Sequence, residues 1–158
     1  MSKVQPIPPG FTAVTPYLAI EGAGQALDFY KRAFGAEEMA RMPGPDGGVA
    51  HAEIRIGGAA LMLGEACPER GAPGAKALKG SPVSIMLYVE DVDAVVERAQ
   101  KAGAKITMPV ADMFWGDRYG TLEDPFGHRW GVATHMRDVT EAEMAEAMRK
   151  MSEQPQPA

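Results

Sequence analysis

The stretch Leu18-Ala19-Ile20-Glu21 decides the fold of this chain, because Leu87-Tyr88-Val89-Glu90 repeats it at an offset of 69 residues. Each copy opens into a segment with helical periodicity, 23–34 in the first case and 92–102 in the second. Self-similarity at a fixed spacing is typical of a duplicated structural unit. We therefore interpret the chain as two copies of one unit, at about residues 11–65 and 82–136, joined by a linker at 66–81 rich in Gly, Pro and Ala.

The spacing of apolar residues predicts the same order of strands and helix in each unit. Apolar residues alternate over 14–20 and 84–89, which indicates a half-buried strand before each helix. Three further strand candidates follow each helix, so each unit has the predicted order βαβββ. These candidates lie at about 37–42, 49–56 and 59–64 in the first unit, and at about 105–110, 118–123 and 128–135 in the second.

This order predicts an α+β fold in which two tandem βαβββ units form a curved mixed sheet with a central cleft. A helix covers one face of each unit's sheet, and a second unit, from the same chain or another, must cover the other face. We expect residues 1–136 to be a single domain. A C-terminal helix should occupy 137–153, where Thr140 and Glu143 form a capping box, and residues 154–158 should be a disordered tail.

Composition excludes several classes of partner. The formal net charge is -5, so no global field attracts nucleic acid or anionic membranes. No apolar stretch reaches the ~20 residues that a membrane span needs, and the first residues lack the apolar core of a signal peptide. We expect a cytoplasmic protein with no nucleic-acid or membrane partner. The single cysteine, Cys67, cannot form an intramolecular disulfide.

Three motifs carry a resemblance to a known family. They are Leu27-Asp28-Phe29-Tyr30, Trp115-Gly116-Asp117-Arg118-Tyr119-Gly120-Thr121 and Asp124-Pro125-Phe126-Gly127-His128-Arg129-Trp130. Together with the duplicated unit they resemble the vicinal oxygen chelate superfamily, the group of glyoxalases, bleomycin resistance proteins and extradiol dioxygenases. The second motif is similar to the PhnB-like branch in particular. The resemblance covers about residues 11–136.

The resemblance implies a divalent metal held by four side chains, one each from the first and last strand of both units. By strand position these slots fall on Thr15, Met62, Ser84 and Gly131. Glycine has no side chain, a thioether suits hard cations poorly, and isolated hydroxyls bind divalent ions weakly. The sequence therefore predicts a protein with no metal and no other cofactor.

Strand alternation predicts which residues face the cleft. If the apolar residues face the helices, the polar and aromatic residues between them turn the other way. The offset of 69 carries this assignment from the third strand of the first unit to Arg118 in the second. The predicted ligand-binding residues are Tyr17, His51, Glu53, Arg55, Met62, Met86, Tyr88, Trp115, Arg118 and Arg129.

Each of these residues also has a structural interpretation. His51, Glu53 and Arg55 are equally typical of a solvated strand face. Arg118 could form a turn-stabilising ion pair with Asp117, and Trp115 could pack at a dimer contact.

Three classes of function remain open. The first is a metal-free binding protein of the glyoxalase and bleomycin-resistance type, which sequesters an aromatic or cationic small molecule in the cleft between the repeats. The alternative is an enzyme of the same superfamily, a lyase, isomerase or dioxygenase-like protein, using a metal or acid–base chemistry by His51 and Glu53. The third is a structural or regulatory dimer whose cleft is vestigial. We favour the first, leave enzymatic activity undecided, and expect a homodimer because open sheet edges invite a partner.

Overall fold

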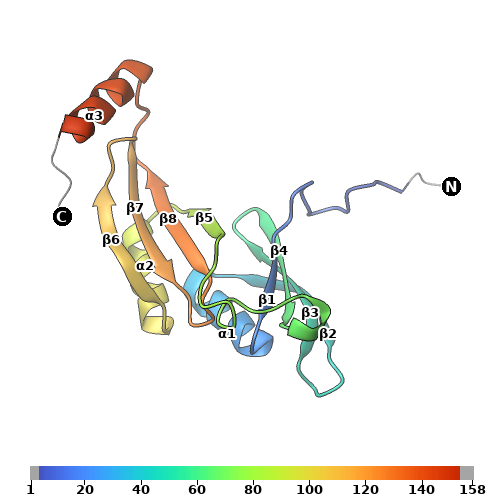
Figure 1. Cartoon of the computed structure of the whole chain (residues 1–158). Coiled ribbons are helices and arrows are strands. Elements are labelled where there is room, and N and C mark those ends of the chain that lie inside the picture. Colours follow the sequence, from blue (N-terminus) through green and yellow to red (C-terminus); the bar gives the residue numbers. More distant parts are fainter. Residues whose placement is uncertain (1–3, 154–158) are drawn as a thin grey trace.

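The computed structural model describes residues 4–153, so the predicted tail at 154–158 lies outside the described residues. Its elements follow the predicted order, and the α+β class with tandem βαβββ units is confirmed (Figure 1). The first unit contains β1 (Tyr17–Ile20), α1 (Ala23–Phe34), β2 (Glu37–Pro43), β3 (Val49–Ile56) and β4 (Ala59–Glu65). The second contains β5 (Ser84–Tyr88), α2 (Val92–Ala102), β6 (Lys105–Asp112), β7 (Asp117–Glu123) and β8 (Arg129–His135). The linker includes a short 3-10 helix, η1 (Pro68–Arg70), and α3 (Glu141–Glu153) ends the described chain.

Each unit forms its own four-stranded mixed sheet. The first sheet has the strand order β1-β4-β3-β2 and the second has the order β5-β8-β7-β6. The first strand of each unit runs parallel to the last, and the other pairs are antiparallel. Within residues 4–153 no strand of one unit pairs with a strand of the other, so β1 and β5 are edge strands.

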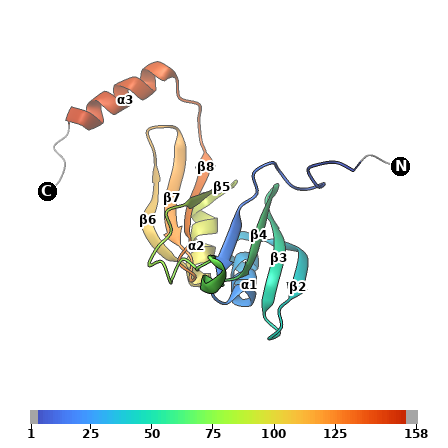
Figure 2. The same ribbon diagram turned by 45° about the vertical axis from the view of Figure 1, so that its right-hand side comes forward.

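The two helices pack against each other as well as against their own sheets. Helix α1 contacts β1, β3 and β4, helix α2 contacts β6, β7 and β8, and residues of both units form one hydrophobic core. Figure 2 shows the two sheets apart, with α1 and α2 side by side at their junction. The face of each sheet that no helix covers, here called its open face, therefore lies on the outside of the chain. The sequence predicts a central cleft between the two open faces. Within a single chain the two open faces do not enclose such a cleft.

A buried aspartate ties the two units together. The Asp124 carboxylate accepts hydrogen bonds from the backbone N–H groups of Phe126 and His128, both at 2.9 Å. It also accepts from the Tyr30 hydroxyl at 2.8 Å and from Trp130 Nε1 at 3.0 Å. Burial, together with the neighbouring carboxylate, raises the pKa of Tyr30 well above its usual value. Because Tyr30 belongs to α1, this motif joins the second unit to the first.

The structure differs from the sequence prediction at the first strand. Alternation predicted a strand from residue 14, but β1 begins at Tyr17 and Val14 is exposed. The Thr12 hydroxyl donates to the Val14 carbonyl and the Thr15 hydroxyl donates to the Thr12 carbonyl. Threonine hydroxyls bonded locally to the backbone compete with a strand ladder, so the chain bends here instead.

Helix α3 extends away from both sheets, and none of its residues is buried (Figures 1 and 2). The predicted capping box is confirmed: Thr140 N donates to Glu143 Oε2 at 2.8 Å and Glu143 N donates to Thr140 Oγ1 at 3.3 Å.

Candidate functional site

The open face of the first sheet brings together the residues that alternation predicted on β3. His51 lies between Tyr17 and Glu53: its Nδ1 is 3.3 Å from the Tyr17 hydroxyl, and its Nε2 is 3.4 Å from Glu53 Oε1. The Tyr17 and His51 rings stack with their centroids 5.6 Å apart. Met62 of β4 is the cross-strand partner of both Tyr17 and Glu53. These four side chains form one aromatic and polar surface.

Arg55 lies farther along the same face. It is the cross-strand neighbour of Ala60, toward the turn between β3 and β4. The N-terminal segment approaches it so closely that a Cβ atom on Gly10 would lie 2.9 Å from Arg55 Nη2. The guanidinium is therefore partly covered by the chain's own N-terminal segment.

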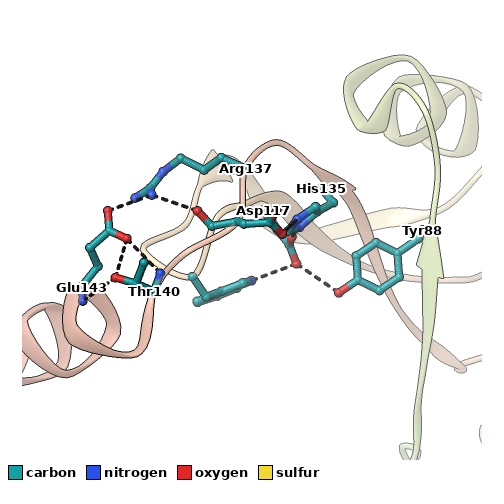
Figure 3. A network of polar contacts seen from close by, with 8 residues as sticks. Tyr88, Asp117, His135, Arg137, Thr140 and Glu143 are labelled. Carbon is teal, nitrogen blue, oxygen red and sulfur yellow. Dashed lines mark hydrogen bonds and ion pairs between the residues drawn. The ribbon is translucent and has the colours of Figure 1, made fainter.

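The open face of the second sheet is organised around Asp117, which is only 5% exposed (Figure 3). Asp117 Oδ1 lies 2.7 Å from His135 Nδ1. Asp117 Oδ2 accepts hydrogen bonds from the Tyr88 hydroxyl and from Trp115 Nε1, each at 3.1 Å. One carboxylate thus orients a phenol, an indole and an imidazole that come from β5, the β6–β7 turn and β8.

These contacts lower the pKa of Asp117 and raise the pKa values of Tyr88 and His135. Burial acts to raise the pKa of Asp117, but the hydrogen bonds from His135, Tyr88 and Trp115 outweigh it, and the pKa lies below its usual value. The hydrogen bond to Asp117 raises the pKa of Tyr88. The hydrogen bonds to Asp117 and, next, to Asp138 raise the pKa of His135. The arrangement therefore favours a charged pair of Asp117 and His135.

The side chains of Tyr119 and Met86 also lie on the open face of the second sheet, where both pack against Gly131. The Trp115 and Tyr119 rings meet edge to face with centroids 5.8 Å apart. A Cβ atom at Gly131 would lie 2.8 Å from Met86 Sδ and 2.9 Å from Tyr119 Cε2. The space that a side chain at position 131 would need is thus already filled by a thioether and a ring.

Arg118 is on the other face of the sheet, and the prediction that it faces the cleft is wrong. Its guanidinium contacts Asp93 in the first turn of α2 at 2.6 Å and Asp112 at 2.9 Å. The alternative ion pair with Asp117 is also wrong, because Asp117 points to the open face.

The prediction for Arg118 is wrong because the two units differ in length by one residue. The cross-strand partners of Glu53 and Thr121 are Met62 and Gly131. Glu53 and Thr121 are 68 residues apart, whereas Met62 and Gly131 are 69 apart. The hairpin of the second unit is one residue longer, and a shift of one residue moves every side chain of a strand to the opposite face.

The predicted site residues therefore divide between two faces. Arg129 lies on the open face of the second sheet, where it is the cross-strand partner of Ser84 and Glu123. Tyr17, His51, Glu53, Arg55 and Met62 lie on the first sheet, Met86, Tyr88, Trp115 and Arg129 lie on the second, and Arg118 lies on neither open face.

Sequence reasoning missed Asp117, Tyr119 and His135 as parts of this surface. Alternation along β7 could have found two of them: Leu122 is an apolar residue that faces the helix, where it is 1% exposed, so Tyr119 and Asp117 must turn the other way. The alternation of β7 itself was a better guide than the repeat offset.

The residues at the family's metal slots do not fit a divalent ion. The Thr15 hydroxyl lies outside β1 and donates to a backbone carbonyl. Position 131 has no side chain and no room for one. Met62 offers a thioether and Ser84 a lone hydroxyl, which are weak ligands for hard cations. In the described range, no three His, Cys, Asp or Glu side chains are grouped as a metal site would require.

Comparisons with known proteins agree with this architecture. The family model "Glyoxalase/Bleomycin resistance protein/Dioxygenase superfamily" matches residues 14–132. An uncharacterised protein of Mycobacterium tuberculosis H37Rv, Rv0887c, is 44% identical over 141 residues, covering 86% of this chain and 82% of that protein. The structure of the Arabidopsis thaliana At5g48480 product is 32% identical, with a TM-score of 0.65, covering 78% of this chain and 98% of its own.

A PhnB protein of Bacillus cereus also shares the fold. Its TM-score is 0.61 at 21% identity, covering 78% of this chain and 99% of that one. The chain belongs to the glyoxalase, bleomycin resistance protein and dioxygenase superfamily, and its structural neighbours include the PhnB-like proteins, as the sequence motifs predicted. Among the described residues, no helix combines the length and hydrophobicity that spanning a bilayer requires.

Proposed function

We propose that this protein binds an aromatic or cationic small molecule without a metal ion. The ligand lies in a cleft between the open face of the first sheet of one copy and the open face of the second sheet of another copy. One observation carries this proposal: both open faces hold aromatic rings and a carboxylate, yet they lie on the outside of one chain. Two copies related by a two-fold axis would form two equivalent clefts.

The exposure of the rings supports a second copy as the cover. Tyr17 is 54% exposed and Tyr88 is 61% exposed, and Met42 and Met86 are exposed on the same faces. Several large apolar side chains exposed on one sheet face are typical of an interaction site. The edge strands β1 and β5 border these faces and offer backbone hydrogen-bonding groups to a partner.

The side-chain chemistry favours aromatic and cationic ligands. Tyr17, Tyr88 and Trp115 offer flat apolar faces that attract cations as well as rings. The Glu53 carboxylate is partly exposed, and among residues 4–153 its one side-chain hydrogen-bonding contact is with the His51 ring. It can therefore pair with a positively charged group on a ligand.

A thermal-shift experiment tests the proposal. Because the metal slots carry unsuitable side chains, addition of Ni, Zn, Mn or Fe should raise the melting temperature by no more than roughly 1–2 °C. Aromatic amines and quaternary ammonium compounds should raise it further than aliphatic acids of similar size. A stoichiometric metal retained through purification and bound by the residues of the open faces would contradict the proposal.

The contact between His51 and Glu53 favours acid–base catalysis as a second candidate. An imidazole held by a carboxylate, with a phenol on its other nitrogen, is an arrangement that can transfer a proton. The test is to incubate each compound found in the screen with the protein and analyse it by mass spectrometry. Conversion that the variant His51→Asn abolishes would favour the enzyme, and recovery of unchanged compound would favour the binding protein.

A further inference from the structure

The open face of the second sheet carries a polar pocket at the end of β7 opposite to Asp117. Its volume is about 260 Å³, and the residues that line it are Ser84, Thr107, Thr121, Glu123, Arg129 and Trp130. Trp130 is buried and its Nε1 donates to Asp124, so this residue forms the floor of the pocket. Each of the other five residues offers a charge or a hydroxyl. The chemistry of this pocket therefore differs from that of the aromatic surface around Asp117.

Glu123 and Arg129 carry opposite charges on neighbouring strands, yet they do not pair with each other. They are direct cross-strand partners in β7 and β8, a position in which opposite charges usually attract each other. Among residues 4–153, neither side chain forms an ion pair within 4.0 Å, and the same holds for Lys105, the cross-strand partner of Glu123 on β6. The guanidinium and the carboxylate that line the pocket can therefore each pair with a charged group of a ligand.

Three hydroxyl groups line the same pocket. Thr107 Oγ1 and Thr121 Oγ1 lie 2.7 Å apart and share one hydrogen bond, in which either hydroxyl can be the donor. The hydroxyl that accepts this bond keeps its own hydrogen for another partner. Ser84, the cross-strand partner of Arg129, adds the third hydroxyl. These groups can donate to a carboxylate that Arg129 binds, or accept from an ammonium that Glu123 binds.

We propose that this pocket binds the head group of a free α-amino acid with an apolar side chain. The carboxylate of the ligand pairs with Arg129, its ammonium pairs with Glu123, and the threonine hydroxyls complete the hydrogen bonds. A zwitterion satisfies both charged side chains at once. An anion without an ammonium would be repelled by Glu123, and a cation without a carboxylate would be repelled by Arg129.

The side chain of the amino acid extends from the pocket toward Gly131. Met86 lies two residues after Ser84 on β5, and Tyr119 lies two residues before Thr121 on β7, so both are on the same face at about 7 Å along their strands. A ring attached to the head group can therefore contact the thioether and the phenol. All of these groups belong to one chain. The inference thus goes beyond the proposed function, since it requires neither a second copy nor Glu53.

Calorimetric titration with L-phenylalanine and two analogues tests the assignment of the two charges. L-Phenylalaninamide keeps the ammonium and lacks the carboxylate, whereas 3-phenylpropanoate keeps the carboxylate and lacks the ammonium. In Arg129→Gln the affinity for phenylalanine should fall about tenfold, and the affinity for the amide should not fall. In Glu123→Gln the affinity for phenylalanine should also fall about tenfold, and the affinity for 3-phenylpropanoate should not fall.

Two control variants locate the site. Lys105→Gln removes a cation from the same end of the sheet but does not change the lining of the pocket, and Glu53→Gln changes only the first sheet; both should leave the affinity for phenylalanine nearly unchanged. Thermal melts of Arg129→Gln and Glu123→Gln should match those of the wild type, because neither side chain forms an ion pair in the described chain. No binding of phenylalanine by the wild type, equal losses for phenylalanine and its amide in Arg129→Gln, or a loss in Lys105→Gln as large as that in Arg129→Gln would overturn the inference. Aromatic amines that bind through Glu53 in the same protein would then leave the proposed function in place.

Discussion

Two carboxylates with different surroundings mark the two open faces. Within the described part of the chain, the Glu53 carboxylate contacts one side-chain nitrogen, His51 Nε2 at 3.4 Å, and its side chain is 25% exposed. Asp117 is buried and accepts hydrogen bonds from three side chains. A carboxylate whose lone pairs are already used positions its neighbours, whereas a partly exposed one can still bind a ligand. In the proposed site, Glu53 is therefore the charge partner of the ligand, and Asp117 positions the rings.

The variant Glu53→Gln tests this assignment. A hydrogen bond to a charged group contributes ~1.5–3 kcal/mol, so a cationic ligand should bind on the order of 10- to 100-fold more weakly. Folding should change by less than about 1 kcal/mol, because the contact with His51 is long and partly exposed to solvent. Calorimetric titration beside thermal melts measures both quantities. An unchanged affinity for every ligand of the screen would remove Glu53 from the site and direct attention to the arginines.

The pair of His135 and Asp117 predicts how stability depends on pH. The pKa of His135 is raised in the folded protein, mainly by the hydrogen bond to Asp117, so its stabilising effect is complete below the unfolded value of about 6.5 and is lost as pH rises through the folded pKa. The pKa of Asp117 is lowered, so its effect is lost only in acid, as pH falls through the folded pKa. The melting temperature should therefore decrease as pH rises above about 6.5.

Two variants isolate the histidine. In His135→Gln the decrease above neutral pH should disappear, as thermal melts in a series of buffers would show. In Asp138→Asn most of the decrease should remain, because Asp117 is the stronger partner and Asp138 is fully exposed. An identical pH dependence in His135→Gln and wild type would show that other groups control it.

At the scale of elements, the two helices begin differently although they are copies. Asp91 caps α2 locally by accepting a hydrogen bond from Ala94 N at 3.0 Å. Helix α1 has Gly22 at the same position, and Glu65 at the end of β4 accepts from Gly22 N at 2.7 Å and from Ala23 N at 3.0 Å. The Glu65 carboxylate of β4 thus accepts hydrogen bonds from free backbone N–H groups at the start of α1, and its negative charge interacts favourably with the helix dipole.

Removal of the Glu65 cap of α1 should lower the free energy of unfolding by as much as removal of the local Asp91 cap of α2. Glu65→Ala should lower the free energy of unfolding by about 1 kcal/mol, and Asp91→Ala should do the same at α2. Urea denaturation followed by circular dichroism measures both. Glu69→Ala, in the exposed turn η1, is the control and should have almost no effect. A loss for Glu65→Ala no larger than that of Glu69→Ala would mean that water caps α1 equally well.

At the scale of the whole molecule, the two open faces lie on the outside of the chain and do not face each other across a cleft. The helix-covered faces of both sheets share one core, so the residues of the proposed ligand site are directed outward from it. Covering them requires a second molecule, and a two-fold arrangement covers both sheets at once. The assembly and the ligand site are therefore coupled in our proposal.

Light scattering at micromolar concentration should report about twice the chain mass of 16.9 kDa. The variant Tyr88→Glu places a charge at an exposed position of the second sheet's open face, next to the Asp117 carboxylate, and should shift the protein toward a monomer with a lower melting temperature. Lys101→Glu, on the exposed surface of α2, is a charge-changing control and should leave the dimer intact. A wild-type monomer would contradict the shared cleft.

The sequence by itself determined the elements, the family and the open-face position of every predicted site residue except Arg118. Helix bounds at 23–34 and 92–102 follow from local apolar periodicity and from the terminating residues Gly35 and Gly103, which adopt left-handed conformations. The alternation of β3 likewise placed His51, Glu53 and Arg55 on one face correctly. These features depend on contacts between residues close in the chain, and such contacts leave a period in the sequence.

Only the tertiary structure decided which way the two units face, and it showed that Asp117 and His135, rather than Arg118, lie on the open face of the second sheet. The two units meet where α1 packs on α2 and where Tyr30 of α1 bonds to Asp124 in the turn between β7 and β8. The Tyr30–Asp124 contact joins residues 94 positions apart, so it leaves no period in the sequence. The extra residue in the second hairpin turned Arg118 inward and Asp117 outward, and a repeat offset cannot reveal an insertion within a turn. Local spacing fixes each strand's two faces, but only long-range packing decides which of them is left open.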